Sequence, residues 1–208
     1  MSAHRSSPRL VVLHALRCVG ASGTDRLARA ARLPAGDVDS ELIDLAVEGL
    51  VARSAGPFGA WSLTASGRET DAAAVAAELE ASGTAGAVRE AFDAFVALNE
   101  DVLAACTDWQ LRPLGTSATR NDHTDHAHDD AVLRRLGILD ARAQPVCAAL
   151  AGALTRFAHY GTRLTDALAR AWSGENSAVT DDLESYHVVW FQLHEDLLAT
   201  LGIPRGWA

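Results

Sequence analysis

Three histidines and four aspartates lie within the ten residues from Asn121 to Asp130. Imidazole and carboxylate groups are ligands that suit zinc, nickel, manganese or iron. The cluster predicts a divalent metal site, zinc or nickel, at His123, Asp125 and His126. The alternative is a polar helix start, because acidic side chains are favourable at the positive end of a helix dipole.

A second group of reactive side chains lies near the C-terminus, where His187, Trp190 and His194 follow one another at spacings of three and four residues. This spacing places them on one face of a helix, and buried imidazoles there need hydrogen-bond partners. A pocket inside a helical bundle is a usual place for a small ligand. We predict a ligand pocket formed by Trp109, Tyr160, Arg163, Tyr186, His187, Trp190 and His194; the alternative is a hydrogen-bonded core without a ligand.

Helical patterns dominate the region that carries both groups, and residues 84–201 are predicted to form an antiparallel bundle of about four helices. The first contains Val88 to Cys106, and a connector, 107–119, follows it. Helix 121–136 would stop at Gly137, and a long helix would begin at Asp140, with Pro145 in its first turn. Thr180 is predicted to cap the last helix, which ends at Gly202.

The N-terminal region has a different order of elements. Helices are predicted from Pro8 onward, over 25–31 and over 37–50, followed by strands 51–53 and 60–63 around a turn at 56–59. Thr64 would cap a fourth helix. We therefore expect a mainly α protein with two domains, residues 1–82 and residues 83–208.

The hairpin region resembles the wing of bacterial MarR-like and PadR-like regulators. It carries Gly49-Leu50-Val51 at the end of the third helix and Leu63-Thr64 followed by Gly67-Arg68 after the wing. This resemblance implies an N-terminal winged helix-turn-helix domain whose third helix enters the major groove while the wing touches the minor groove. Asn121–Asp125 and 185–198 also resemble the C-terminal region of uncharacterised bacterial proteins that are labelled as regulators.

Charge on the third predicted helix argues against the simplest DNA interpretation. Asp37, Glu41, Asp44 and Glu48 share one stripe, whereas DNA affinity comes largely from basic groups that neutralise phosphates. The candidate DNA contacts are Arg26, Arg29, Arg32, Ser40, Arg53 and Arg68. The alternative is a winged-helix module that docks on a basic protein and does not bind DNA.

Composition favours a cytoplasmic protein. The chain has 208 residues and a net charge of −9, and its acidic part beyond residue 70 is expected to avoid nonspecific nucleic-acid binding and anionic membranes. Its 3 cysteines are far apart and predict reduced core residues, and no segment has the roughly 20 apolar residues of a membrane span.

The combined prediction is a bacterial transcriptional regulator in which the bundle forms a homodimer and senses a small-molecule effector or a metal. We expect no enzyme, because the sequence has neither a nucleophile elbow nor a phosphate-binding loop. A metal-dependent enzyme stays an alternative if the Asn121–Asp130 cluster and the His187/His194 stripe converge.

Overall fold

The computed structural model describes residues 3–55, 59–114 and 117–204. Most of these residues are helical, which confirms the mainly α expectation, and the described strands form two short antiparallel pairs. No helix in these ranges is both long and apolar enough to cross a membrane.

The first five elements pack around one apolar core, which includes Val12, Leu27 and Leu42, and the sixth follows them along the first helix. Ser7 begins the first helix by accepting a hydrogen bond from the Leu10 N–H, and Thr64 begins the fourth in the same way. The predicted turn at 56–59 lies largely outside the described residues. The elements are α1 (Pro8–Val19), α2 (Thr24–Ala31), α3 (Ala35–Val47), β1 (Val51–Arg53), β2 (Trp61–Leu63) and α4 (Ala65–Ser82).

Gly67 allows α4 to approach the end of the α3–β1 connection. A Cβ atom at this position would lie 1.9 Å from the Leu50 carbonyl oxygen. Backbone atoms cannot move away as a flexible side chain can, so only glycine fits here. Gly49 has a different role: its φ of +75° lets the chain turn out of α3 into β1.

A Gly67→Ala substitution is therefore expected to lower the free energy of unfolding by at least about 1–3 kcal/mol, because the methyl group overpacks a backbone contact. Gly137→Ala is the matched control, since it lies inside α6 with open space around the added Cβ. That substitution should raise stability by about 0.5–1 kcal/mol through helix propensity. Urea unfolding of both variants measures the difference, and equal effects would contradict the close approach.

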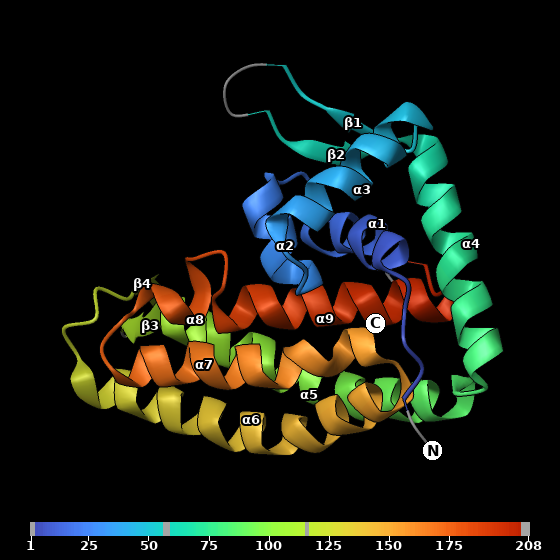
Figure 1. Ribbon diagram of the computed structural model, residues 1–208. Coiled ribbons are helices and arrows are strands. Elements are labelled where there is room, and N and C mark those ends of the chain that lie inside the picture. Colours follow the sequence, from blue (N-terminus) through green and yellow to red (C-terminus); the bar gives the residue numbers. More distant parts are fainter. Residues whose placement is uncertain (1–2, 56–58, 115–116, 205–208) are drawn as a thin grey trace.

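The remaining elements form a helical bundle that surrounds a second, larger core. In Figure 1 these long helices form the lower layer, α1–α3 lie above α9, and α4 descends along one side to the start of α5. The elements are α5 (Ala85–Gln110), β3 (Leu111–Leu114), β4 (Ser117–Arg120), α6 (His126–Ala153), the 3₁₀ helix η1 (Thr155–His159), α7 (Tyr160–Trp172), α8 (Ser177–Thr180) and α9 (Tyr186–Leu201).

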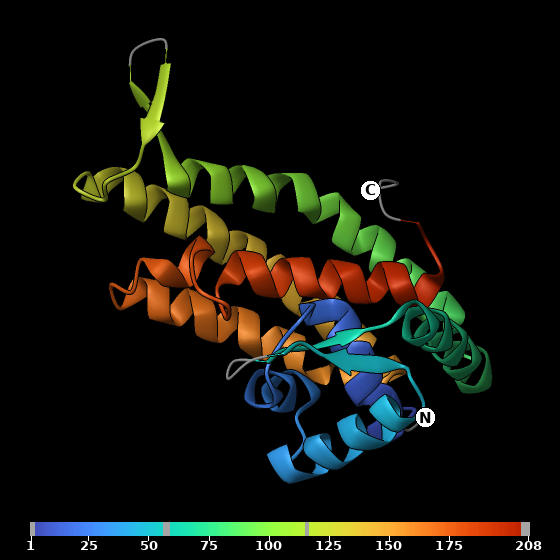
Figure 2. The same ribbon diagram turned by 90° about the horizontal axis from the view of Figure 1, so that it is seen from above.

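The helix break expected between Gly137 and Asp140 does not occur. Helix α6 runs without interruption through Gly137, and Pro145 lies inside it and not in a first turn. Proline at 145 lacks the N–H that would bond to the Ala141 carbonyl, but both residues are exposed, so water can satisfy that oxygen. Buried residues on either side, such as Leu139 and Leu150, keep the helix on the core. The expected connector 107–119 is also different: α5 extends to Gln110, and a hairpin follows it, which projects from the bundle in Figure 2.

The chain instead breaks at Leu154, inside the long helix that the sequence predicts from Asp140. The His4 N–H donates to the Ala153 carbonyl at 3.1 Å, and the Thr155 N–H donates to the His4 carbonyl at 2.9 Å. Backbone groups of His4 thus supply hydrogen bonds to Ala153 and Thr155 that the next turn of the helix would otherwise supply. Near the other end, Ser185 rather than Thr180 caps α9, because Thr180 ends the short helix α8.

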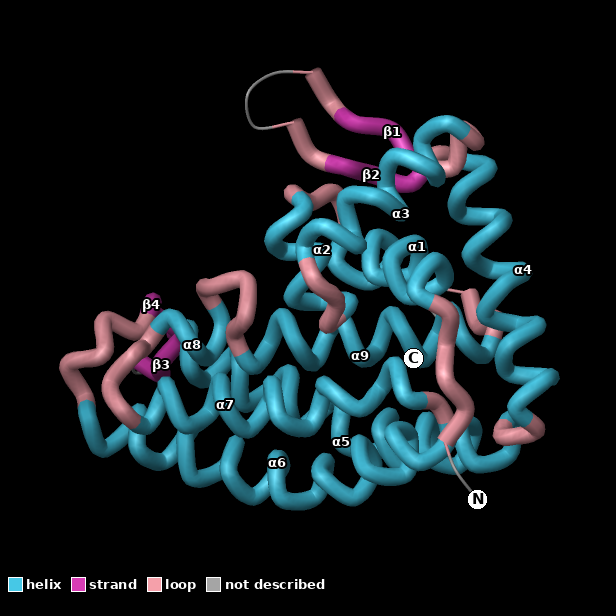
Figure 3. The backbone as a smooth tube through the Cα atoms, viewed as in Figure 1, coloured by secondary structure: helices cyan, strands magenta, loops and turns pink. Residues whose placement is uncertain are grey.

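The two cores meet where α1 and α4 pack against α9. Figure 3 shows this arrangement as a backbone tube, with α1 lying above α9 and the N-terminal segment passing down toward the bundle. Side chains that lie far apart in sequence are therefore neighbours at this junction.

Candidate functional site

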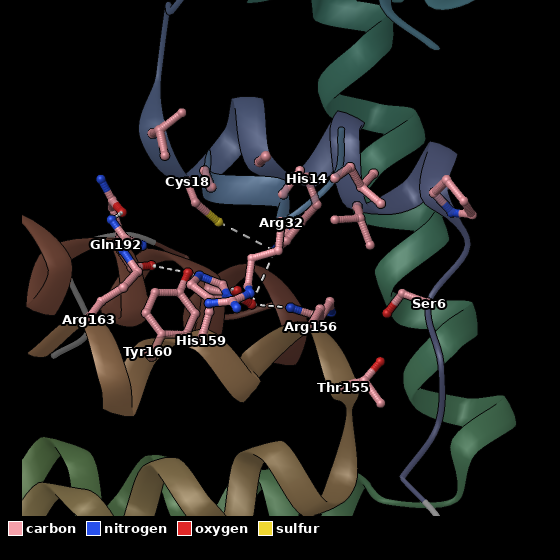
Figure 4. Close-up of a pocket in the computed structure, with 18 of the residues that line it drawn as sticks. Ser6, His14, Cys18, Arg32, Thr155, Arg156, His159, Tyr160, Arg163 and Gln192 are labelled. Carbon is pink, nitrogen blue, oxygen red and sulfur yellow. Dashed lines mark hydrogen bonds and ion pairs between the residues drawn. The ribbon is translucent and has the colours of Figure 1, made fainter. Parts of the chain in front are cut away.

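A cavity of about 220 Å³ lies between the N-terminal helices α1 and α2 and the bundle elements η1, α7 and α9. Figure 4 shows its lining, with Cys18 and His14 on one side and Arg156, Tyr160 and Gln192 on the other. Val11, Ala15 and Leu33 contribute an apolar wall. The cavity is somewhat larger than one of about 150 Å³ that holds benzene, so it fits a small molecule.

Three polar atoms of the lining residues lack a hydrogen-bond partner within the described ranges. They are Arg163 Nη1, Gln192 Nε2 and Ser6 Oγ, and all three atoms are buried. Leaving a buried donor unpaired costs about 1–3 kcal/mol. A bound molecule or ordered water that pairs with these atoms would remove that cost.

The cavity lining includes two exposed arginines, Arg5 and Arg32, which add positive charge to it. Arg32 also adopts a left-handed backbone, with φ of 53°, at the C-terminus of α2. Such a conformation is unfavourable for a residue with a side chain and is often found at functional positions. The cavity therefore suits an anionic or strongly polar molecule.

His14 connects three helices through its two ring nitrogens. Nδ1 lies 2.9 Å from Asp71 Oδ1 on α4, and Nε2 lies 3.1 Å from Asp196 Oδ1 on α9. Burial lowers the pKa of His14, but Cys18 and Asp196 raise it by more, so the net shift is upward. Carboxylates only accept hydrogen bonds, so this arrangement favours an imidazolium that donates to both.

Arg156 forms a second buried link across the same junction. Its Nε donates to Glu78 Oε2 on α4 at 2.9 Å, and its Nη1 forms an ion pair with Asp196 on α9. Burial raises the pKa of Asp196, but the charges of Arg156 and His14 hold it well below its ordinary value. Asp196 thus stays ionised, and it joins the His14 and Arg156 interactions into one network.

His159, also in the cavity wall, is held neutral. Burial lowers its pKa to about 4, and the nearby positive charge of Arg163 acts in the same direction. A neutral imidazole can both donate and accept a hydrogen bond, which adds a mixed polar group to a wall that otherwise carries fixed charges.

His159 is expected to make the protein less stable in acid. Between about pH 6.5 and pH 4 the unfolded chain binds a proton at this residue that the folded chain does not, so stability falls as the pH falls. At about 1.4 kcal/mol per pH unit, the loss amounts to about 3 kcal/mol. Urea unfolding at pH 7 and pH 4 should show a loss smaller by this amount in His159→Gln, whereas equal losses in both proteins would exclude a neutral His159.

No family model, curated protein or solved structure matches this chain. The chemistry of the cavity and of the surfaces around it is therefore the basis for inferring its function.

Two of the residues predicted for the ligand pocket, Tyr160 and Arg163, do line this cavity. The other five lie elsewhere in the bundle. Trp109 donates to the Asn176 carbonyl, Trp190 donates to Asn99, and Tyr186 contacts Asp140. His194 packs against the ring of Phe95, and His187 is half-buried on α9. The predicted set is thus divided between the cavity and the bundle core.

The six predicted DNA contacts also divide into two groups. Arg29 and Arg32 line a second cavity between α2 and the bundle, and the Arg26 side chain donates to Ser22. The other three are exposed near α3 and the β1–β2 hairpin: Ser40, Arg53 and Arg68.

The three predicted metal ligands have local roles. His123 Nδ1 lies 3.0 Å from Asp129, Asp125 caps α6 by accepting from the His128 N–H, and His126 is exposed. In the described part of the chain, the one metal-capable group of three such side chains is a different one: His14, Cys18 and Asp196. A metal at His123, Asp125 and His126 stays a prediction.

Sequence reasoning missed the junction network because its members are far apart along the chain. His14 and Asp196 are separated by 182 positions, and Arg156 and Glu78 by 78. One signal was present: His14 and Cys18 interrupt an apolar helix at a spacing of four residues, which places them on one face.

Proposed function

We propose that this chain is a one-component transcriptional regulator of the bacterial cytoplasm. Residues 1–82 would act as a winged helix-turn-helix DNA-binding domain and residues 83–208 as a sensing and dimerising bundle. The order of three helices, a hairpin and a fourth helix supports the first assignment, together with the close approach of Gly67 to Leu50. The MarR-like resemblance of the hairpin region supports it as well.

The cavity at the junction carries the proposal. Its walls come from α1 and α2 on one side and from η1, α7 and α9 on the other. A small anionic effector bound there would contact both regions and stabilise one placement of the N-terminal helices over another. In a homodimer this would change the spacing of two DNA-reading helices, which must lie about 34 Å apart to reach successive major grooves.

DNA contacts would come from the exposed residues Ser40, Arg53 and Arg68 around α3 and the hairpin. Arg32 would be linked to the effector instead of to phosphates, since it lines the junction cavity. Arg29 lines the second cavity against the bundle, and Arg26 bonds to Ser22. This division gives α2 a position between the sensing cavity and the DNA-reading surface.

Binding of the purified protein to its own upstream DNA tests the proposal. Fluorescence anisotropy across a salt series should show saturable, submicromolar binding that weakens steeply as salt rises, because phosphate neutralisation releases counterions. Sedimentation of the complex should show two chains per site. An absence of binding at low salt, where electrostatic attraction is strongest, would overturn the DNA-binding function.

The exposed face of α3 favours a second candidate, a protein-docking module. Ile43 is 57% exposed and Val47 is 84% exposed, and both lie next to the carboxylates of Asp44 and Glu48. An apolar pair with an acidic rim fits a basic, partly apolar protein surface better than a phosphate backbone. This candidate predicts no DNA binding at low salt and loss of a basic partner when the carboxylates are changed to serine.

A further inference from the structure

His14 and Cys18 lie one turn apart on α1, and Asp196 faces them from α9. The His14 Nε2 atom is 3.5 Å from the Cys18 sulfur and 3.1 Å from Asp196 Oδ1. Within the described residues, these are the three side chains whose ligand atoms all lie within 4.8 Å of one another. Imidazole, thiolate and carboxylate are the ligand types that proteins use for zinc.

Two of the three separations between these atoms are close to those of a tetrahedral metal site, and the third is no more than 4.8 Å. Bonds of about 2.0 Å to nitrogen and about 2.3 Å to sulfur, at tetrahedral angles, place the two ligand atoms about 3.6 Å apart. The corresponding separation of nitrogen and oxygen is about 3.4 Å. The separations of 3.5 Å and 3.1 Å are close to these values, so small side-chain movements would admit an ion.

The second nitrogen of His14 is held as it is in metal sites. Nδ1 lies 2.9 Å from Asp71, a residue whose side chain is almost fully buried. A carboxylate on the distal nitrogen fixes the ring orientation and makes the nitrogen that faces the metal more basic. Asp71 Oδ2 has no hydrogen-bond partner among the described residues, so its negative charge is not otherwise satisfied.

Charge at the junction also accommodates a divalent ion. Three buried carboxylates, Asp71, Glu78 and Asp196, surround Arg156 and His14, so even with a protonated His14 one negative charge is in excess. A divalent cation that displaces the imidazole proton and the thiol proton leaves the total charge of the cluster unchanged. Metal ligands must lose their protons in this way.

We propose that the junction binds one zinc ion through His14 Nε2, Cys18 Sγ and the Asp196 carboxylate. Three protein ligands leave a fourth position, which is the arrangement of sites that bind an exchangeable ligand. All three residues line the 220 Å³ cavity, so this position opens toward it. The site goes beyond the proposed regulator, because it gives the junction a metal requirement whether or not the chain binds DNA.

A competing explanation of the same geometry is an imidazolium that bridges Asp71 and Asp196 without any metal. The two explanations differ in the role of the Cys18 sulfur. A bridging imidazolium needs no thiolate, whereas the proposed ion is bound by it. Cys106 and Cys147 are equally buried core cysteines outside the cluster, so they are matched controls.

The test is a titration of chelator-treated full-length protein with cobalt(II), followed by competition with zinc. We expect one ion per chain, a sulfur-to-cobalt charge-transfer band in the near ultraviolet, and loss of that band when zinc is added. Cys18→Ser should weaken zinc binding at least about 100-fold, since removing a ligand costs more than removing its supporting group. Cys106→Ser should leave the affinity within about twofold.

Asp71→Asn tests the supporting role of that carboxylate, and a loss of zinc affinity of about 10–100-fold is expected. Circular dichroism of each metal-free variant confirms that it is folded before titration. The proposal is overturned if the wild-type protein binds no cobalt or zinc at micromolar concentrations, or if folded Cys18→Ser retains the charge-transfer band. Either result would leave the bridging imidazolium as the explanation.

Discussion

Arg156→Met is expected to lower the free energy of unfolding by about 3–5 kcal/mol, a large effect for a single side-chain replacement. The guanidinium is buried with Glu78 and Asp196, and it also bonds to Thr200. Methionine fills a similar volume but removes the guanidinium that Glu78 and Asp196 share. Among the described residues, Asp196 then keeps only His14 as a cationic partner and Glu78 keeps only the more distant His4. The penalty therefore comes from uncompensated buried charge and not from a cavity.

Arg170→Met is the matched control. Arg170 also forms ion pairs with two carboxylates, Glu175 and Asp182, but its side chain is about one third exposed. Ion pairs in contact with water are worth about 0–1 kcal/mol, so this variant should unfold almost as the wild type does. Urea unfolding at neutral pH measures both variants. A similar loss in the free energy of unfolding for both variants would mean that burial of Arg156 at the junction does not determine its contribution to stability.

Replacing Asp37, Glu41, Asp44 and Glu48 with serine is expected to tighten binding to upstream DNA by about 100-fold at low salt, because like charges at an interface cost several kcal/mol. Asp37 and Asp44 are exposed on α3 and Glu41 is half-buried there, while Glu48 is exposed directly after the helix ends. The gain should shrink as salt screens the repulsion. Fluorescence anisotropy at two salt concentrations measures both effects.

A control variant keeps the same change in net charge but places it away from α3. Glu80, Glu90, Asp93 and Glu100 are all exposed on α4 and α5. Their replacement with serine should change DNA affinity only a few-fold, through the overall charge of the protein. If both quadruple variants strengthen binding equally, α3 does not face the DNA. If neither binds, the docking function proposed for α3 gains support.

Local signals in the sequence were sufficient for the N-terminal elements. Thr64 accepts the expected capping bond, and the first helix begins at Pro8 as expected. Each of these roles depends on neighbours that lie within a few residues or on the adjacent element. Turn and cap chemistry of this kind is readable from a single chain because it is short-range.

Helix boundaries in the bundle were less predictable, because packing overrides local propensity there. Pro145 and Gly137 are weak helix formers, yet burial of the flanking apolar residues holds α6 together. The break at Leu154 depends on hydrogen bonds from His4, a residue near the other end of the chain. No pattern near residue 154 contains that information.

The candidate site was predicted only in part. Tyr160 and Arg163 were expected to line a pocket and do so, but His14, Cys18 and Asp196 were not among the expected site residues. A spacing of four residues between His14 and Cys18 was visible, whereas their convergence with α9 depends on how the two cores pack together. Residue patterns within one segment do not predict long-range packing of this kind.

The wide separation of His14 from Asp196 also has a consequence for the growing chain on the ribosome. The apolar core formed by α1–α3 and the hairpin draws only on residues 12–63, so it can close early in synthesis. Asp196 emerges 182 residues after His14. Until α9 is made, His14 on α1 and Asp71 and Glu78 on α4 lack the helix that packs against α1 and α4 in the folded protein.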